Sequence, residues 1–137
     1  MRVKLDKGAY MPEYAHDTDA GADLRSPVKA IVPARGSAFI DTGVHIELPF
    51  RTVGILKSKS GLCKKHGITT EGGVIDCGYT GSIGVTLHNQ SMNPYIILPG
   101  DKITQLLVLP VINLPFEQVE QLHETERGDG GFGSTGK

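Results

Sequence analysis

The segment Arg127–Lys137 has a composition suited to holding a phosphorylated ligand. Its sequence, RGDGGFGSTGK, contains five glycines together with an arginine, a serine and a threonine. Glycine exposes backbone N–H groups and lets the chain approach a ligand closely, while hydroxyl and guanidinium groups donate hydrogen bonds to phosphate oxygens. Phe132 adds a flat apolar face that can cover a base. This combination predicts a segment that closes over a nucleotide-like ligand.

A second candidate site is the glycine-bracketed segment 72–81, GGVIDCGYTG. Asp76 follows the apolar pair Val74 and Ile75, so we expect its carboxylate to be partly desolvated, as suits a group that polarises a water molecule. We expect the segment to be hairpin-like. From these residues alone, Asp76 is as well explained by an Asx turn. Tyr79 is explained either by strand packing or by a ring stacked on a sugar.

Two further segments offer donors to an anion. In the segment 56–62, LKSKSGL, lysines and serines precede Gly61, although solvated lysines are the more common outcome for such a turn. In the segment 100–106, GDKITQL, Gln105 is an uncharged donor at the point where a turn enters a predicted strand.

The acidic segment HDTDAGADL does not encode a calcium loop. Gly21 stands where an EF-hand requires Asp or Asn, and the later Glu is missing. One carboxylate can still help to hold hydrated magnesium, because that ion keeps several waters and binds substrate phosphates. The five histidines lack metal-ligand spacing and neither cysteine lies in a CxxC pair, so we expect no zinc site.

Composition narrows the function classes. The 137 residues fit one domain, and 14 Lys plus Arg balance 15 Asp plus Glu, so no broad basic field is available for nucleic acid. No apolar run is long enough to span a bilayer. Two cysteines and an N-terminus without an apolar signal run favour a reducing, cytoplasmic compartment.

The hydrophobic pattern predicts an all-β fold. Short apolar runs separated by turn residues are typical of an antiparallel sandwich or barrel. The runs cover residues 28–32, 38–46, 53–56, 83–87, 95–98 and 103–111. Prolines such as Pro33, Pro49 and Pro99 should mark strand ends, and the one expected helix is short, around Gly61–His66. A break in composition near His123 divides the chain into a β domain, 1–122, and a flexible glycine-rich arm, 123–137.

Five segments, in order, resemble the five motifs of the trimeric dUTP diphosphatases (dUTPases). They are AGADL (20–24), KSGL (59–62), GVIDCGYTG (73–81), GDKITQL (100–106) and RGDGGFGSTG (127–136). The resemblance covers most of the chain. It implies a jelly-roll-like fold, a homotrimer with shared active sites, and magnesium-dependent hydrolysis of dUTP to dUMP and pyrophosphate.

The resemblance also implies roles for residues around the third motif. Asp76 matches the aspartate that activates the attacking water, and Tyr79 matches the tyrosine that packs on deoxyribose. The backbone of Gly73, Val74 and Ile75 corresponds to the hairpin that reads uracil, and Gly84 to the strand that passes the base.

Other motifs of the family imply contacts with the phosphates and magnesium. Lys59, Ser60, Gly61 and Gln105 match phosphate-contacting positions. Asp23 matches an aspartate that supports magnesium through a water molecule rather than directly.

In the tail, the resemblance assigns the γ-phosphate clamp to Arg127 together with Gly133, Ser134 and Thr135. It assigns Phe132 to cover uracil.

The sequence departs from the family pattern at two positions. Lys59 stands where the second motif usually has arginine, which keeps the charge but loses the planar two-pronged donor. Thr70 stands where an asparagine often helps to read the base, which leaves backbone contacts with uracil there.

Two alternatives stay open. A dCTP deaminase shares this fold, but it needs a glutamate in the strand after the third motif, and the run Ile83–Leu87 contains none. A nucleotide-responsive regulatory protein that binds another protein would leave no motif, so the sequence does not exclude it.

Overall fold

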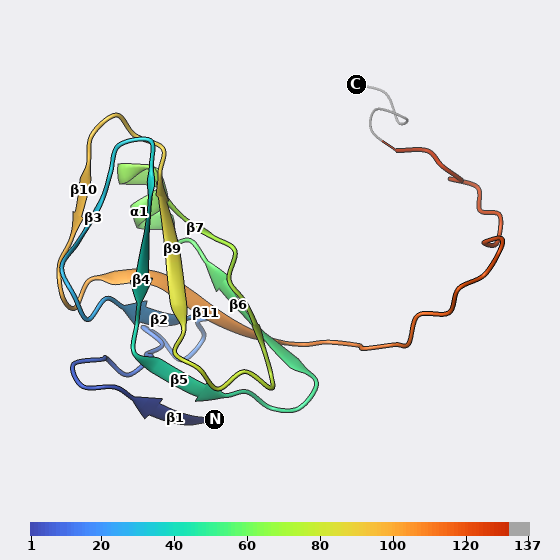
Figure 1. The fold of residues 1–137 in the computed structure, drawn as a ribbon, viewed down its shortest axis with the longest axis horizontal. Coiled ribbons are helices and arrows are strands. Elements are labelled where there is room, and N and C mark those ends of the chain that lie inside the picture. Colours follow the sequence, from blue (N-terminus) through green and yellow to red (C-terminus); the bar gives the residue numbers. More distant parts are fainter. Residues whose placement is uncertain (132–137) are drawn as a thin grey trace.

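The computed structural model describes residues 1–131 and is built from short antiparallel strands with one short helix (Figure 1). This confirms the all-β prediction. The strands are β1 (Arg2–Leu5), β2 (Ala22–Arg25), β3 (Ala30–Val32), β4 (Ser37–Asp41), β5 (Val44–Glu47), β6 (Thr52–Lys57), β7 (Ile68–Glu71), β8 (Val74–Asp76), β9 (Gly84–Asn89), β10 (Tyr95–Ile97) and β11 (Lys102–Pro110), and the helix is α1 (Ser60–His66).

Two sheets supply most of the core. One has the strand order β2-β11-β6-β8 and the other β4-β9-β7, with the ribbons β1-β5 and β10-β3 beside them. In β9, Val85, Leu87 and Asn89 are buried while the residues between them are partly exposed, which is the alternation of a strand with one face on a core. The inward faces meet in one apolar cluster. The result is a jelly-roll-like sandwich, and the described strands do not close into a barrel.

Turn residues divide the predicted apolar runs. The run 38–46 becomes β4 and β5, because Gly43 adopts a φ of 66° between them. Pro33 directly follows β3, and Pro49 and Pro99 lie two positions beyond β5 and β10, as predicted for strand ends. The run 28–32 is shorter than predicted, since only Ala30–Val32 pairs with β10.

The predicted hairpin at 72–81 is wrong. β7 pairs with β9 and β8 pairs with β6, so the chain passes from one sheet to the other between them. Gly72 and Gly73 make this crossing at φ values of 65° and 89°, where side chains are disfavoured. The Gly73 carbonyl accepts a hydrogen bond from the Leu56 N–H at 2.8 Å, which fixes the start of β8 against β6.

The helix α1 confirms the predicted short helix. Gly67 ends it in the left-handed conformation, and its N–H donates to the Cys63 carbonyl. Lys64, Lys65 and His66 occupy the last turn, where positive charge is favourable near the helix C-terminus.

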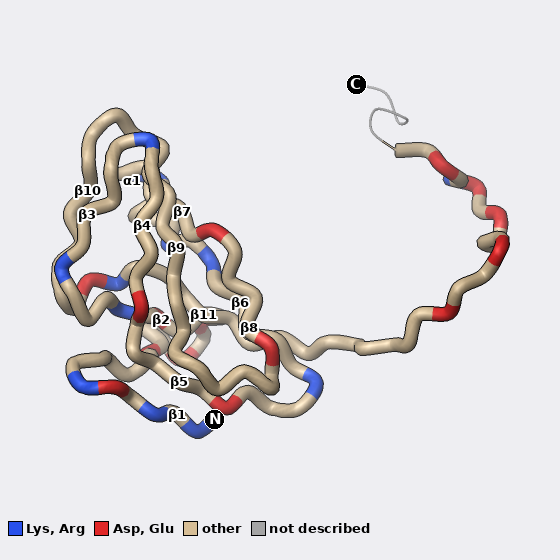
Figure 2. The backbone as a smooth tube through the Cα atoms, viewed as in Figure 1, with Lys and Arg blue, Asp and Glu red and all other residues tan. Residues whose placement is uncertain are grey.

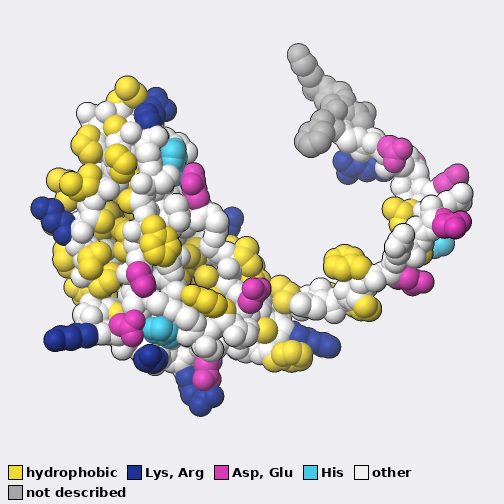
Figure 3. Space-filling view, viewed as in Figure 1, with side chains coloured by type: hydrophobic (Ala, Val, Ile, Leu, Met, Phe, Trp, Pro, Cys, Tyr) yellow, Lys and Arg dark blue, Asp and Glu magenta, His cyan; other side chains and the backbone are white. Residues whose placement is uncertain are grey.

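Beyond β11, residues 111–131 form no strand or helix and run away from the sheets (Figure 1). The charged side chains of this segment are mainly acidic (Figure 2). It also carries exposed apolar side chains, including Ile112, Leu114 and Phe116 (Figure 3). Within residues 1–131, no helix has the length and apolar character needed to cross a bilayer.

The fully buried side-chain amide of Asn89 joins β9 to β3 and to the turn that follows β9. Its Nδ2 donates to the Val32 carbonyl at 3.1 Å and to the Asn93 carbonyl at 2.8 Å, and its Oδ1 accepts from the Ser91 N–H at 2.9 Å. Asn89→Leu would deprive the Val32 carbonyl and the Ser91 N–H of this partner, each at a cost of about 1–3 kcal/mol, while the Asn93 carbonyl keeps its bond from the Ser91 hydroxyl. We expect a loss of roughly 3 kcal/mol or more in the free energy of unfolding measured by denaturant titration. Gln90→Leu, at the exposed neighbour, is the control and should change it by less than about 0.5 kcal/mol.

Candidate active site

A buried carboxylate held by two lysines forms the polar centre of the structure. Asp23 on β2 is buried, and Lys59 bonds its Oδ1 while the Lys102 Nζ lies 2.6 Å from its Oδ2. Burial alone would raise the pKa of Asp23, but the hydrogen bonds from Lys102 and Lys59 outweigh it and lower the pKa below its usual value. Asp23 is therefore ionised, and the two ammonium groups leave this cluster with excess positive charge.

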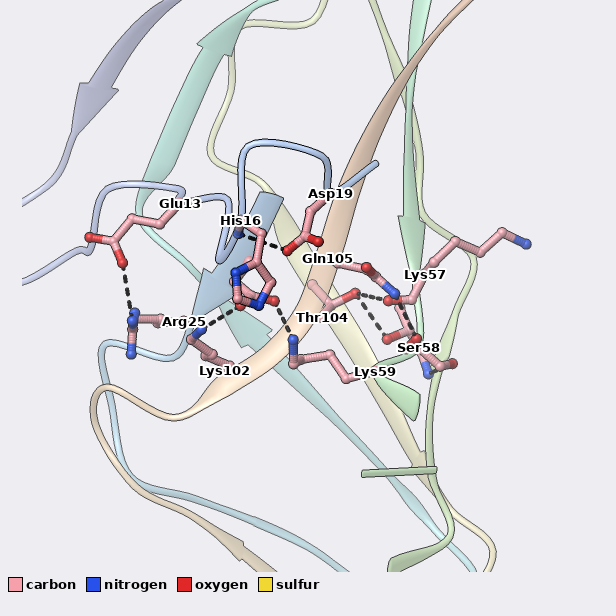
Figure 4. A network of polar contacts seen from close by, with 12 residues as sticks. Glu13, His16, Asp19, Arg25, Lys57, Ser58, Lys59, Lys102, Thr104 and Gln105 are labelled. Carbon is pink, nitrogen blue, oxygen red and sulfur yellow. Dashed lines mark hydrogen bonds and ion pairs between the residues drawn. The ribbon is translucent and has the colours of Figure 1, made fainter. Parts of the chain in front are cut away.

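Strand pairing brings Gln105 and Lys57 beside this cluster. Asp23 lies opposite Gln105 on β11, and Gln105 lies opposite Lys57 on β6. Gly21 lies against the Gln105 side chain, where a Cβ would be 2.6 Å from Gln105 Oε1 and would displace that amide. Figure 4 shows Lys59 and Lys102 within one network of polar contacts, with Gln105 and Ser58 next to each other in the same network. The Gln105 amide donates to the Ser58 carbonyl at 3.2 Å, which fixes its orientation.

A pocket of about 370 Å³ opens over this cluster. Its lining contains Asp19, Asp23, Lys57, Lys59 and Gln105, together with Ala15, Ala20, Gly21 and Leu107. Ammonium and amide donors around a concave surface suit an anion with several oxygen atoms. Ser60 and Gly61 are exposed in the first turn of α1, directly after Lys59.

Asp76 lies elsewhere, at the end of β8. Its side chain is exposed in the structure, so the expected partial desolvation is wrong for the single chain. It does not form an Asx turn either, since no backbone N–H within residues 1–131 donates to its carboxylate. The Tyr79 N–H donates instead to the Asp76 backbone carbonyl at 2.9 Å. Asp76 and Cys77 line a pocket of about 510 Å³ with residues 50–53, Val111 and Asn113.

Tyr79 lies in the loop 77–82 that follows Asp76, which we call the Asp76 loop. It is outside any strand, so the strand-packing interpretation is wrong. Its hydroxyl donates to the Ser82 carbonyl at 2.9 Å, and its ring lies so close to Gly81 that a Cβ there would be 2.4 Å from the hydroxyl oxygen. The side chain remains 45% exposed, which leaves ring surface available to a ligand.

Thr70 and Gly84 have local roles that the sequence did not indicate. The Thr70 hydroxyl donates to Thr104 Oγ1 at 3.1 Å, and its N–H donates to Ser58 Oγ at 2.8 Å, so its side chain joins strands. Gly84 lies under the exposed Phe39 ring, where a Cβ would be 2.2 Å from Phe39 Cζ. In this state Phe39 covers the face of Gly84 that was expected to meet a base.

Strand register arranges the site residues in three parallel rows. All lie on the face of the four-stranded sheet opposite the core, and we name them the polar row, the apolar row and the Asp76 row. They consist of Asp23, Gln105 and Lys57; of Leu107, Ile55 and Val74; and of Leu109, Val53 and Asp76. Lys57 and Val53 are four positions apart on β6, which corresponds to about 13 Å. The single chain thus separates Asp76 from the polar row.

Comparisons with known sequences and with solved structures point to one protein family. The family described as dUTPase matches residues 7–136. The deoxyuridine 5'-triphosphate nucleotidohydrolases of Crocosphaera subtropica and Clostridium tetani are each 43% identical to this chain. The first match covers 98% of this chain and 96% of that protein, and the second 100% and 97%. The chain belongs to the dUTPase family.

Solved dUTPase structures share the whole fold. A variant of the Staphylococcus bacteriophage 80alpha dUTPase with dUpNHpp superimposes with a TM-score of 0.92 at 32% identity, covering 99% of this chain and 98% of that one. A variant of the dUTPase from phage phi11 of S. aureus, described as coordinating a structural Mg(II) ion, gives 0.83 at 30% identity over 90% and 98%.

The described part of this dUTPase contains no cluster of three or more His, Cys, Asp or Glu side chains able to hold a metal by themselves. Asp23 is compatible with a metal-bound water, because each carboxylate oxygen has two acceptor positions and a lysine takes one on each. Asp19 lines the same pocket. The donor set fits a magnesium ion held mainly by phosphates and water.

The arm residues of this dUTPase are only partly described. The Arg127 Nε donates to the Gly130 carbonyl at 2.9 Å within the segment that runs away from the sheets after β11 (Figure 1). Phe132, Gly133, Ser134 and Thr135 lie outside the described residues.

Sequence reasoning missed Lys102 and gave Lys57 only as one of the lysines in the segment 56–62. Strand register alone brings Lys102 onto Asp23 and Lys57 beside Gln105. Once the pairing of β2 with β11 is known, the sequence can indicate this contact, because Lys102 pairs with Arg25, two positions from the buried Asp23.

Gly72 and Gly73 form a matched pair for testing the crossing that positions β8. Both have positive φ, so alanine strains each by about 1–2 kcal/mol. A Cβ at Gly72 meets nothing within 4 Å, whereas one at Gly73 lies 2.6 Å from Leu56 Cβ. We expect Gly73→Ala to lower the free energy of unfolding by at least about 1 kcal/mol more than Gly72→Ala, from the added overpacking. Equal losses in denaturant titrations would contradict this packing.

Proposed function

We propose that this member of the dUTPase family hydrolyses dUTP to dUMP and pyrophosphate, with Asp76 as the general base. The observation that carries the proposal is the state of Asp76. Its carboxylate is exposed, lines a pocket, and has no side-chain hydrogen bond or ion pair within residues 1–131. A base needs a free acceptor oxygen within reach of the water that it deprotonates. The cysteines of this protein, Cys63 and Cys77, are both free thiols, which suits a reducing compartment. We therefore propose that the enzyme acts in the cytoplasm.

In the proposed reaction, Asp76 accepts a proton from a water molecule as the water oxygen bonds to the α-phosphorus of dUTP. The bond from that phosphorus to the oxygen bridging the α- and β-phosphates breaks, and its electron pair leaves with pyrophosphate. Little covalent chemistry is left to the protein, so positioning and charge neutralisation supply most of the rate. Asp76 has to be held in line with the breaking bond.

The Asp76 loop supplies the sugar contact. The Tyr79 ring rests on Gly81 with its hydroxyl bonded to the Ser82 carbonyl, so it is a fixed flat surface beside Asp76. A deoxyribose packed on that ring would leave no room for a ribose 2′-hydroxyl. Backbone groups of Gly73, Val74 and Ile75 are proposed to read uracil, while Gly84 could do so only after the Phe39 side chain moves.

The polar row and its neighbours supply the phosphate contacts. Lys57, Lys59 and Gln105 present donors around the pocket over Asp23, and Ser60 and Gly61 follow directly. Lys59 carries its charge as a single ammonium that already bonds Asp23, so it neutralises phosphate without a two-pronged grip. In the arm, Arg127 and Gly133 to Thr135 are proposed to clamp the γ-phosphate while Phe132 covers uracil and closure excludes water.

Magnesium fits this site with Asp23 accepting from one of the water molecules around the ion. When bound, the ion neutralises charge on the triphosphate oxygens. The protein's own contribution is to hold Asp23 ionised through Lys59 and Lys102, so that its oxygens remain acceptors.

The separation of the rows supports active sites shared within a homotrimer. Asp76 and the phosphate donors lie about 13 Å apart along β6, on either side of the apolar row. Val74 in that row is 67% exposed, which is unusual for a valine central to a site. A second copy packed on this face would cover the apolar row and bring its own donors to Asp76. The exposed apolar arm residues fit packing on a neighbouring copy.

The alternatives are less well supported. β9 contains no glutamate, so deamination of dCTP has no proton shuttle at that strand. For the phage 80alpha dUTPase, whose structure with dUpNHpp superimposes at a TM-score of 0.93 and 33% identity, control of virulence-gene transfer is described. A regulatory partner for this chain stays a prediction from that likeness.

Turnover assays test the function and the base together. With magnesium and each deoxynucleoside triphosphate in turn, we expect pyrophosphate from dUTP alone. Asp76→Asn should lower kcat by about 100-fold or more, the usual contribution of a general base, while dUTP binding measured by calorimetry persists. Asp17→Asn, at an exposed carboxylate, is the matched control and should keep wild-type kcat. Ammonia released from dCTP, or wild-type kcat in Asp76→Asn, would refute the assignment.

Mixing two inactive variants tests whether sites are shared. One variant is Asp76→Asn, and the other combines Ser60→Ala with Gln105→Ala, which leaves the Asp23 ion pairs intact. If the halves of a site come from different chains, joint refolding at equal amounts should restore activity at about one site in four, because each half is then intact in half of the cases. Asp76→Asn mixed with Asp76→Ala is the control and should stay inactive. No recovery in the first mixture would place both halves in one chain.

A further inference from the structure

The Asp76 loop is attached to the rest of the protein by a histidine that the proposed mechanism does not use. His45 lies on β5, partly exposed, beside a pocket of about 360 Å³ that Thr80 also lines. Its Nδ1 lies 2.9 Å from the Thr80 carbonyl oxygen, and its Nε2 lies 3.2 Å from Asp6 Oδ2. The ring therefore links the turn after β1 to the loop that carries Tyr79.

Both contacts require the same protonation state. A carbonyl oxygen and a carboxylate oxygen only accept hydrogen bonds, so each ring nitrogen of His45 must carry a proton to bond its partner. Neutral imidazole has one N–H and can keep only one of the two contacts. The geometry is thus complete only with the imidazolium ion.

The charged groups around His45 favour that ion on balance. Lys4 lies opposite His45 in the β1-β5 pairing and opposes a second positive charge, whereas Asp6 favours it. The hydrogen bonds to Thr80 and Asp6 raise the pKa of His45 above its usual value despite partial desolvation. The other charged groups facing this region are Asp41, which interacts with His45, and Arg2 and Glu47, which line the same pocket.

A second contact holds the same loop without titrating near neutral pH. The Ser82 hydroxyl donates to Asp41 Oδ1, which also accepts from the Gly43 N–H at 3.0 Å. These bonds keep the pKa of Asp41 below its usual value, so Asp41 stays ionised whenever His45 titrates. The loop is therefore held at Ser82 over the whole interval in which His45 titrates, whereas its link through His45 to Asp6 requires the imidazolium ion.

We propose that His45 is a positioning residue for the proposed dUTPase reaction. Its imidazolium ion binds the Thr80 carbonyl and thereby holds Tyr79 in place for contact with the sugar. The proposal rests on the proposed function of the Asp76 loop. Because the folded pKa lies above the unfolded value of about 6.5, the link from Asp6 through His45 to Thr80 is complete below about pH 6.5 and opens at one of its two ends as pH rises through the folded pKa. Substrate binding should weaken over the same interval.

Kinetics against pH test the functional part. For the wild-type protein we expect KM for dUTP to rise about fivefold through the His45 midpoint, the effect of losing one hydrogen bond, with a smaller change in kcat. His45→Gln should have a KM near the high-pH value and no step in this interval. His88→Gln is the matched control, because His88 also lies near a carboxylate, 3.7 Å from Glu71 Oε1, but contacts Ser37 and not the loop. Its profile should follow the wild type, and an unchanged step in His45→Gln would overturn the proposal.

Titration followed by NMR tests the attachment without turnover. The His45 ring signal, assigned by its loss in His45→Gln, should titrate above about pH 6.5. Asp6→Asn should lower that midpoint by removing the negative charge, and the amide signal of Gly81 should shift with the same midpoint. A midpoint at or below 6.5, or one unchanged by Asp6→Asn, would refute the attachment. If dUTP is not hydrolysed at all, the proposed function fails while these titrations still decide whether His45 holds the loop.

Discussion

The pairing of β6 with β11 on one side and β8 on the other is the constraint on which the site depends. Each strand has one face on the core, so its register cannot slip by one residue without turning buried side chains outward. With Leu56, Ile75 and Leu106 held inside, Lys57, Asp76 and Gln105 are forced onto the opposite face. The packing of the core therefore decides which polar side chains are presented, and in what order along the sheet.

The cluster at Asp23 shows how this sheet carries a buried charge. An ion that is removed from water needs partners for its remaining hydrogen-bonding positions, or burial would favour its neutral form. Lys59 and Lys102 provide them from β6–α1 and β11, and their stems lie partly buried while their ammonium groups remain close to the pocket. Because two cations face one anion, the cluster retains a positive charge that phosphate can neutralise. A lysine at position 59 can make both contacts, because its ammonium group has three N–H donors that can bond Asp23 and a phosphate oxygen at the same time.

The sequence was sufficient where the information is local, and insufficient where it depends on pairing across the chain. Alternating apolar residues and turn-forming glycines and prolines revealed the strands of the sandwich, and the helix before Gly67 was found from the same pattern. The position of Asp76 among glycines and apolar residues also makes it a candidate from the sequence alone, and its role as the base stays a prediction. The crossing at Gly72 and Gly73 was mistaken for a hairpin, since two glycines between short strands fit either connection. Likewise, Lys102 on Asp23 and Thr80 on His45 join residues that only the folded chain makes neighbours.

Exposure of the apolar row supports the proposed homotrimer. Ile55 and Leu107 are only half-buried, and Val74 is largely exposed, although they lie between two sets of polar residues that a triphosphate would have to bridge. Covering these side chains with a further copy would stabilise the complex through apolar burial. It would also lower the local dielectric around Asp76, which has no partner of its own in the single chain, and so strengthen its interaction with a bound water. The desolvation that the sequence suggested for Asp76 would then arise from assembly rather than from the fold of one chain.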